Sequence, residues 1–339
     1  MSQRRIGMNG RGVAAVLLLA LLAGISLSLV IRAPGAVTQA AGAAQVRLGV
    51  DSFILGAQIH VAAERGLFKK YGIDPVVQVF SYGADTLDAV LAGRSDFGVG
   101  MDFATLTRLA PGQLRLVATI MEPDPGFHKL AVSSAINDPK DLRGKRLGVA
   151  QGSLQEYVTL RYLEVNGIPE DSVKLTPFSS LFEIIAALRA GRIDAAWVWG
   201  EGTDQAKEIP GVRILTDDSA ARQQSLGFLV ASRQLVEKNP QVVVATLKAL
   251  AEATDWMLSN MNEASKIVAD KVKAPQEQVL TEMRRENYTL SLKDEQLKAM
   301  ESLAQFMVNK GIIKEKLSVR QNVAPDALRS VDPARVSLK

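Results

Sequence analysis

Arg47-Leu48-Gly49-Val50 returns along the chain as Arg146-Leu147-Gly148-Val149, and two further patterns return in the same order. Gly72-Ile73 reappears as Gly167-Ile168, and Ala89-Val90-Leu91-Ala92-Gly93-Arg94-Ser95-Asp96 reappears as Ala187-Leu188-Arg189-Ala190-Gly191-Arg192-Ile193-Asp194. The offsets are 146 − 47 = 99, 167 − 72 = 95 and 187 − 89 = 98 residues, so only the loop lengths differ. Solenoid units are shorter, roughly 20 to 50 residues. We therefore predict a duplicated α/β lobe with a ligand cleft between the copies.

The N-terminal segment has the layout of an export signal. Its first 44 residues carry four arginines and no acidic residue, with an apolar stretch from Val13 to Ile31 and a small-residue site at Ala41-Gly42-Ala43. This pattern predicts a signal peptide over residues 1–43 and export to the periplasm. The apolar stretch has 31 − 13 + 1 = 19 residues, which is enough to span a bilayer. An uncleaved membrane anchor therefore stays open as the alternative.

Composition limits the function classes. The chain has 40 basic and 36 acidic residues, and without the four arginines of the leader the balance is 36 − 36 = 0. The basic character belongs to the leader and gives no support for a nucleic-acid partner. There is no cysteine, and hence no disulfide and no thiolate nucleophile. The remaining length, about 295 residues, is enough for two domains.

The order of predicted elements places the lobes along the chain. Strands at 46–50, 75–80, 96–99 and 114–120 alternate with helices at 57–71 and 85–91, which predicts a parallel sheet. A linker at 121–126, a strand at 129–133 and the second copy at 146–199 follow, and a strand at 226–231 leads back. After Arg233 we expect helices to residue 309 and a wrapping tail beyond Val319. The predicted lobes are residues 44–128 with 226–339, and residues 129–225, hinged by two crossover segments.

The first lobe also resembles a known family. The segment Ala62-Ala63-Glu64-Arg65-Gly66-Leu67-Phe68-Lys69-Lys70-Tyr71-Gly72-Ile73 is similar to a segment of ABC-importer substrate-binding proteins, in the branch for taurine, aliphatic sulfonates, nitrate and thiamine-pyrimidine precursors. The match continues in order through Gly93-Arg94, Asp138-Pro139, Gly152-Ser153, Val198-Trp199 and Asn239-Pro240, and covers about residues 46–260. The resemblance implies a two-lobed type II periplasmic-binding-protein fold, a small-molecule ligand, and a monomer that serves an ABC permease and its cytoplasmic ATPase.

Candidate ligand contacts lie on the turns that follow the strands, because ligands bind at the carboxyl ends of strands in open α/β sheets. Trp199 matches the cleft tryptophan of the family, and serines at helix starts can either cap the helix or face an anion. The predicted ligand-binding residues are Asp51, Phe53, Ser81, Tyr82, Asp102, Gly152, Ser153, Glu156, Trp199 and Glu201.

The charges on these turns bear on the ligand. No arginine falls on them, whereas Asp51, Asp102, Glu156 and Glu201 do, with Glu201 standing where many relatives have proline. A dianion would favour an arginine fork. The carboxylates indicate a ligand with a positive or hydrogen-donating part, unless they are solvated rim charges.

Enzyme chemistry has little support in the sequence. The chain has only two histidines, His60 and His128, and no clustered metal-ligand spacing. We predict no cofactor, no metal and no catalytic residue. Two other readings stay open: a ligand-sensing ectodomain anchored by the N-terminal segment, and a pyrimidine-related enzyme of the same fold.

Overall fold

The computed structural model describes residues 43–109, 112–221, 225–314 and 317–338. The predicted leader, including the apolar stretch from Val13 to Ile31, lies outside the described residues. Among those that are described, no helix is both long and apolar enough to cross a membrane.

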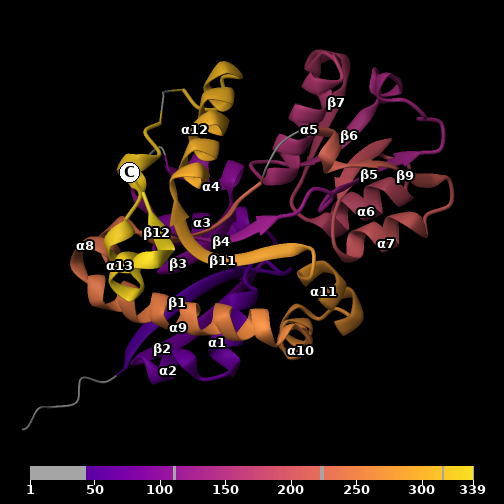
Figure 1. Cartoon of the computed structure of the whole chain (residues 1–339). Helices are drawn as coiled ribbons and strands as arrows, with labels where there is room; N and C mark the ends of the chain where they lie inside the picture. Colours follow the sequence, from indigo (N-terminus) through magenta and orange to yellow (C-terminus); the bar gives the residue numbers. More distant parts are fainter. Residues whose placement is uncertain (1–42, 110–111, 222–224, 315–316, 339) are drawn as a thin grey trace, which may run out of the picture. The chain divides into compact units, whose positions relative to one another are not determined.

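One sheet has seven strands in the order β12-β11-β4-β10-β3-β1-β2 (Figure 1). β1 is parallel to β2 and β3, whereas β10 is antiparallel to both β3 and β4. The sheet is thus mixed, which corrects the expectation of a parallel sheet, because β10 enters it from the other lobe. Its strands are β1 (Ala44–Asp51), β2 (Ile73–Phe80), β3 (Phe97–Met101), β4 (Leu114–Pro123), β10 (Gly227–Ser232), β11 (Glu286–Lys293) and β12 (Val336–Ser337).

A second sheet has five strands in the order β7-β6-β8-β5-β9. β6 is parallel to β7 and β8, and β5 is antiparallel to β8 and β9. Its strands are β5 (Lys129–Ser133), β6 (Arg146–Ala150), β7 (Lys174–Phe178), β8 (Ala195–Val198) and β9 (Val212–Asp217). We call the part built on the seven-stranded sheet lobe one, and the part built on the five-stranded sheet lobe two.

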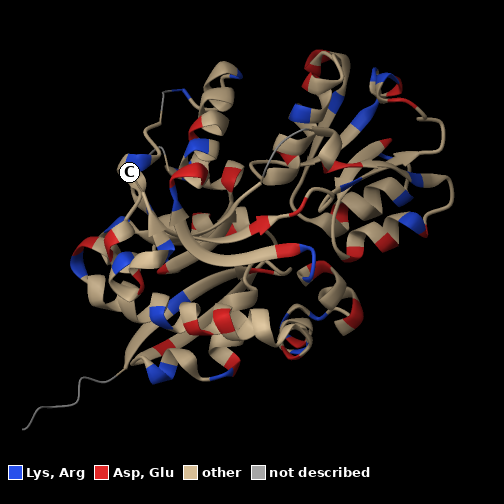
Figure 2. Ribbon diagram, in the orientation of Figure 1, with Lys and Arg blue, Asp and Glu red and all other residues tan. Residues whose placement is uncertain are grey.

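Helices cover both faces of each sheet. In lobe one, α1, α2 and α9 share one apolar cluster with Val46 and Leu48, while α3 and α4 share a second cluster that continues into lobe two. The helices of lobe one are α1 (Ala57–Glu64), α2 (Leu67–Lys70), α3 (Gly83–Leu91), α4 (Asp102–Leu109), α8 (Arg233–Lys238), α9 (Pro240–Ser259), α10 (Met261–Val272), α11 (Gln276–Met283), α12 (Asp294–Asn309) and α13 (Pro325–Val331). Those of lobe two are α5 (Leu154–Val165), α6 (Leu181–Arg189) and α7 (Glu201–Lys207). In the view of Figure 2, acidic and basic residues are interspersed over these helices.

The repeated motif forms the same clamp in each lobe. In lobe one, the guanidinium of Arg47 donates to both carboxylate oxygens of Asp96, at 3.1 and 2.8 Å, and to the Gly93 carbonyl at 2.6 Å. In lobe two, Arg146 donates to both oxygens of Asp194 at 3.0 and 2.7 Å, and to the Gly191 carbonyl at 2.8 Å. Each clamp joins the start of one strand to the turn before its neighbour, away from the carboxyl ends. The duplication is therefore visible in the same three contacts of each lobe, although Arg47 uses Nη1 and Arg146 uses Nη2 for the glycine carbonyl.

Two segments cross between the sheets, and they are bonded to each other. One lies between β4 and β5, the other between β9 and β10. The carboxylate of Asp218, on the second segment, accepts from the backbone N–H of Gly126 and from that of His128 at 2.9 Å on the first. The backbone N–H of Asp218 donates to the His128 carbonyl at 3.1 Å. The two crossing segments are thus hydrogen-bonded to each other through Asp218.

Two elements differ from the sequence prediction. The single helix expected over residues 57–71 breaks at Gly66, whose φ of +68° suits glycine, so that α1 and α2 are separate. The region after Arg233 is not wholly helical, because β11 pairs with β4 and β12 pairs with β11. The tail beyond Val319 contains α13 and β12 rather than irregular chain alone.

Candidate functional site

A pocket lies where the carboxyl ends of the strands of both lobes meet. Lobe one contributes Asp51, Phe53, Ile54 and Leu55 after β1, Tyr82, Gly83 and Ala84 at the start of α3, and Met101, Ala104 and Met121. Lobe two contributes Ser153, Leu154 and Gln155 at the start of α5, and Trp199 after β8; Phe127 and His128 belong to the first crossing segment. We call this the interlobe pocket.

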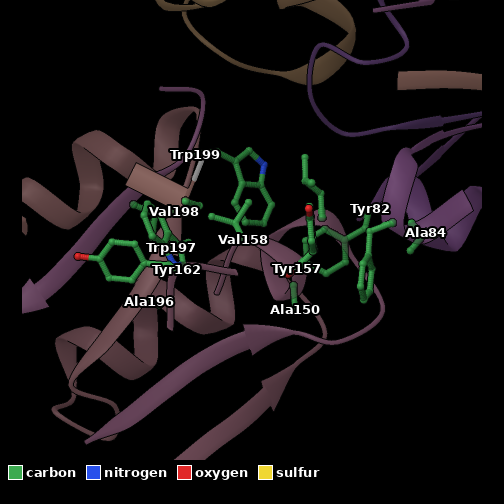
Figure 3. Close-up of a cluster of buried hydrophobic side chains, with 14 of the residues drawn as sticks. Tyr82, Ala84, Ala150, Tyr157, Val158, Tyr162, Ala196, Trp197, Val198 and Trp199 are labelled. Carbon is green, nitrogen blue, oxygen red and sulfur yellow. The ribbon is translucent and has the colours of Figure 1, made fainter. Parts of the chain in front are cut away.

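Trp199 is the centre of an aromatic group in the interlobe pocket. Its ring lies 5.6 Å from Phe53, 5.8 Å from Tyr82 and 5.4 Å from His128, measured between centroids. Figure 3 shows Trp199 and Tyr82 entering from different elements, with Trp197 beside Tyr162. Trp197 is 1% exposed and packs edge-on against Tyr162 at 5.2 Å. The two tryptophans thus have different surroundings: Trp199 forms pocket wall and Trp197 forms core.

The cavity of the interlobe pocket is small, about 60 Å³, and it is partly open to solvent. A larger solute fits only if the pocket widens, through movement of its side chains or of the two lobes.

Two helix N-termini border the interlobe pocket. The first turns of α3 and α5 line it, and neither N-cap side chain accepts from its helix. Each first turn carries a carboxylate: Asp85 accepts from the Tyr82 N–H at 3.1 Å, and Glu156 accepts from the Gly152 N–H at 2.6 Å. Ser153 stands at the N-cap of α5 and is 9% exposed, but its hydroxyl donates to the Ala150 carbonyl at 2.6 Å instead of accepting from the helix. The helix dipole and the N–H groups of these first turns favour a negative charge, and the carboxylates of Asp85 and Glu156 offset part of that preference.

Tyr82 presents a hydroxyl that no protein group satisfies. The side chain is buried and lines the pocket, and its Oη has no hydrogen-bond partner within the described part of the chain. Burial raises the pKa of this phenol, which stays a neutral donor at physiological pH. A buried donor without a partner costs about 1–3 kcal/mol, so a ligand that accepts from Tyr82 would recover this free energy.

Asp51 lines the pocket, but its acceptor capacity is already used. Its carboxylate accepts from the backbone N–H of Gly56 at 3.2 Å and from other N–H groups of the same loop. Burial raises its pKa to about 7, against the lowering effect of these bonds.

Asp102 is in a similar situation, although it does not line the pocket. It accepts from the N–H groups of Phe103 at 2.7 Å and Leu226 at 3.1 Å, and burial raises its pKa to about 7. Both carboxylates therefore serve the backbone of lobe one.

Four further predicted residues lie outside the lining of the interlobe pocket. Gly152 donates its N–H to Glu156 at 2.6 Å, and burial raises the pKa of that glutamate. Glu201, at the start of α7, accepts from Gln205 at 2.7 Å. Ser81 is exposed and its carbonyl accepts from Ser52 at 3.2 Å. None of these four lines the interlobe pocket, so half of the ten predicted residues do so: Asp51, Phe53, Tyr82, Ser153 and Trp199.

His128 and Gln155 line the pocket but were not among the predicted ligand contacts. The Nδ1 of His128 lies 3.1 Å from the Asp218 carboxylate. Burial opposes ionisation of Asp218, but the bonds from His128 and Gly126 outweigh it and lower the pKa of this carboxyl. Gln155 donates to the carbonyls of Gly148 and Trp197 at 3.0 and 3.2 Å, and so holds the ends of β6 and β8 together. The available signal for Gln155 was its place between the predicted residues Ser153 and Glu156 on the same turn.

Other polar groups give no second centre. His60 is buried in α1 outside the pocket, and burial lowers its pKa to about 4. Within the described residues there is no group of three or more His, Cys, Asp or Glu that could hold a metal ion.

Comparison with known proteins bears on this geometry. The family model described as "NMT1/THI5 like" matches residues 56–264, which is more than half of the chain and includes most of the pocket. The chain belongs to the NMT1/THI5-like family. This confirms the family resemblance inferred from the sequence motifs.

Curated relatives of this family member include binding proteins. It is 27% identical over 244 residues to a protein of Brucella abortus (strain 2308) assigned as a binding protein, covering 70% of this chain and 75% of the relative. It is 29% identical over 202 residues to the taurine-binding periplasmic protein of Escherichia coli (strain K12), covering 58% and 62%. An enzyme also matches: the 4-amino-5-hydroxymethyl-2-methylpyrimidine phosphate synthase of Candida albicans (strain WO-1) is 26% identical over 228 residues, covering 61% and 64%.

Solved structures establish the fold. The alkanesulfonate-binding protein SsuA from Xanthomonas axonopodis pv. citri, bound to MOPS, superposes with a TM-score of 0.73 at 23% identity, covering 84% of this chain and 100% of that one. A Candida albicans protein described as having the generic periplasmic binding protein fold gives 0.67 at 12% identity, covering 87% and 97%. The predicted two-lobed α/β binding-protein fold is confirmed.

Proposed function

We propose that this protein is the solute-binding component of an ABC importer and that it holds a small organic anion of the sulfonate class in the interlobe pocket. One observation carries the proposal: the N-termini of α3 and α5, one from each lobe, border the same aromatic pocket, and neither N-cap side chain bonds the N–H groups of its helix. Helix N-termini bind anionic groups through their free N–H groups and their dipole.

The pocket also fits the organic part of such a solute. The rings of Phe53, Tyr82 and Trp199 form an apolar wall that suits an alkyl or aryl chain. The names of two matched proteins give sulfonates as ligands, taurine for one and alkanesulfonates for the other. At the coarser level, this supports a solute-binding protein.

The acidic residues on the turns suggested a ligand with a positive or hydrogen-donating part, but their positions in the structure give this less support. Asp102, Glu156 and Glu201 are bonded within the protein and lie off the pocket wall. Only Asp51 lines it, and its oxygens already accept from backbone N–H groups. With a pKa near 7, Asp51 can also carry a proton beside an anionic solute. The anionic group is therefore the part of the solute that the pocket recognises.

Location and partners follow from the same proposal. An importer component of this kind is exported and meets its permease outside the cytoplasm, in the periplasm. The anchored sensing ectodomain would use the same pocket. N-terminal sequencing of the exported protein separates the two, because a start near Ala44 excludes the anchor.

A thermal-shift screen tests the ligand class. The panel contains alkyl and amino sulfonates, nitrate, alkylamines and aminopyrimidines, each in large excess. A solute present at a hundred times its Kd stabilises the folded state by about 2.7 kcal/mol. We expect the organic sulfonates to raise the melting temperature most. A response to amines or pyrimidines alone would overturn the proposed class.

One observation favours a second candidate, an enzyme. His128 lies 3.1 Å from Asp218 and lines the pocket, and a carboxylate on Nδ1 is the arrangement that prepares Nε2 as a general base. An enzyme of pyrimidine synthesis is also among the relatives. Turnover of any screened compound, followed by mass spectrometry and abolished in His128→Asn, would favour this candidate. Binding without turnover favours the importer.

A further inference from the structure

Arg108 of lobe one makes a hydrogen bond across the lobe boundary. It lies on α4, and its guanidinium donates to both carboxylate oxygens of Asp88 on α3, at 2.7 and 2.8 Å. Its Nη1 donates to the Thr107 hydroxyl and the Ala104 carbonyl of lobe one at 3.0 and 3.3 Å, and to the backbone carbonyl of Gly152 in lobe two at 3.1 Å. The ion pair with Asp88 fixes the direction of the guanidinium, so Nη1 is held in place to reach the other lobe.

Gly152 is the residue through which α5 can be positioned. Its φ of +73° turns the chain into the helix, and its N–H donates to Glu156 in the first turn. The next residue, Ser153, lines the interlobe pocket. Gly152 therefore donates its N–H to Glu156 of lobe two and accepts at its carbonyl from Arg108 of lobe one.

A second contact between the lobes lies one turn along α5. The ring of Tyr157 stacks on Phe103 of α4, with centroids 5.6 Å apart and planes at 15°. Its edge meets Phe306 of α12 at 5.4 Å. The first half of α5 thus contacts lobe one at two points outside the pocket.

We propose that Arg108 is a positioning residue for solute binding, because it holds the N-terminus of α5 against lobe one and so sets the closed geometry of the pocket. This inference rests on the proposed function of the pocket. Arg108 and Asp88 do not line the pocket, so the effect passes through α5 and not through contact with the solute.

The chain contains a matched control. Arg146 also forks onto an aspartate, Asp194, and donates to a glycine carbonyl, Gly191, with similar distances. All three of these residues lie in lobe two. Arg108 and Arg146 therefore each fork onto an aspartate and donate to a glycine carbonyl, and of these bonds only the one from Arg108 to Gly152 crosses between the lobes.

The test compares Arg108→Gln, Arg108→Lys and Arg146→Gln with the wild type. For the solute that stabilises best in the screen, Kd and koff are measured together with the melting temperature. We expect Arg108→Gln to weaken binding about ten-fold, mainly through faster dissociation, as the loss of a bond from a charged group does. Arg108→Lys should restore part of the affinity. Arg146→Gln should lower the melting temperature and leave Kd unchanged.

Two results would overturn the inference: a wild-type Kd in Arg108→Gln, or an equal loss of affinity in Arg146→Gln. A readout without solute separates failure here from failure of the proposed function. Because the chain has no cysteine, spin labels can be placed at Arg94→Cys and Arg192→Cys, exposed and equivalent positions of the two lobes. We expect Arg108→Gln, and not Arg146→Gln, to broaden the distance distribution of the solute-free protein. If the wild type binds nothing in the panel, the proposed function fails, and this distance comparison still decides the role of Arg108.

Discussion

The two lobes are alike at the strand ends that lie away from the pocket, which we call the rear. They differ at the carboxyl ends of the strands, which we call the front. At the rear, Arg47 with Asp96 and Arg146 with Asp194 form the same three contacts. At the front, the positions equivalent to Asp51 and Asp102 are Ala150 and Gly200, at offsets of 150 − 51 = 99 and 200 − 102 = 98. The duplication keeps the clamps that fold each lobe and changes residues at the carboxyl ends of the strands, of which Asp51 lines the pocket and Asp102 does not.

An equivalent pair of glutamines shows the change in detail. Gln58 and Gln155 lie 155 − 58 = 97 residues apart, and each donates to two carbonyls. The Oε1 of Gln155 accepts from the Ala150 N–H at 2.8 Å. At the equivalent position in lobe one stands Asp51, whose carboxylate accepts from the Gly56 N–H at 3.2 Å, and the buried Oε1 of Gln58 has no hydrogen-bond partner among the described residues. The bond that Gln155 makes to the end of its strand therefore has no counterpart at Gln58.

The largest expected effect separates the two tryptophans of lobe two. Trp199→Ala should weaken solute binding at least thirty-fold, because loss of a central aromatic anchor costs about 2 kcal/mol or more. Trp197→Ala should destabilise folding by about 3–5 kcal/mol, since it leaves a cavity against Tyr162. Calorimetric titration and denaturant unfolding measure the two quantities. Equal affinity in Trp199→Ala and wild type would place the solute elsewhere.

The rear clamps should respond alike. Arg47→Gln and Arg146→Gln each remove the charged partner of an aspartate and a carbonyl, and each should lower the unfolding free energy by a similar, modest amount, because both guanidinium groups are more than one third exposed. Urea unfolding of both variants, with circular dichroism as the probe, checks this. A cost confined to one lobe would show that the clamps are not equivalent.

The pH dependence should differ in sign between front and rear. Burial raises the pKa of Asp51 to about 7, so the folded state binds more protons than the unfolded state between about pH 4 and 7, and stability falls as pH rises through this window. Asp51→Asn should flatten this slope by up to about 1.4 kcal/mol per pH unit.

The rear control for this pH comparison is Asp194. The bond from Arg146 lowers the pKa of Asp194, so its contribution is present above the unfolded pKa and is lost as pH falls through the folded one. Asp194→Asn should therefore remove stability at neutral pH and little in strong acid. Unfolding free energies measured from pH 3 to 8 test both variants, and slopes of the same sign would contradict the assignment.

The smallest expected effect concerns Tyr82. Tyr82→Phe removes a buried hydroxyl that has no hydrogen-bond partner among the residues that the structure describes, so the melting temperature should stay the same or rise slightly. If the hydroxyl donates to the solute, Kd should increase several-fold. Tyr162→Phe, remote from the pocket, is the control. Unchanged affinity in Tyr82→Phe would assign the hydroxyl no part in recognition.

The parts of the fold that occur in both lobes could be predicted from the sequence. The motifs at Arg47 and Arg146 fixed the strand ends, and the turns after the strands led to five of the pocket residues. β11 was missed because only Arg284 and Arg285 separate it from α11, although Tyr288, Leu290 and Leu292 alternate with polar residues as in a strand. Glu156 and Glu201 were assigned to the ligand because sequence cannot show that Gly152 and Gln205 already bond them. His128 reaches the pocket only through the fold of the crossing segments.

The most direct test of this account is a crystal structure of the protein with the solute that stabilises it best. The account predicts the anionic group within hydrogen-bond reach of the first-turn N–H groups of α3 or α5, with the organic part against Trp199 of lobe two and Tyr82 of lobe one. A solute that touched only one lobe, or that turned its charge away from both helix N-termini, would contradict it.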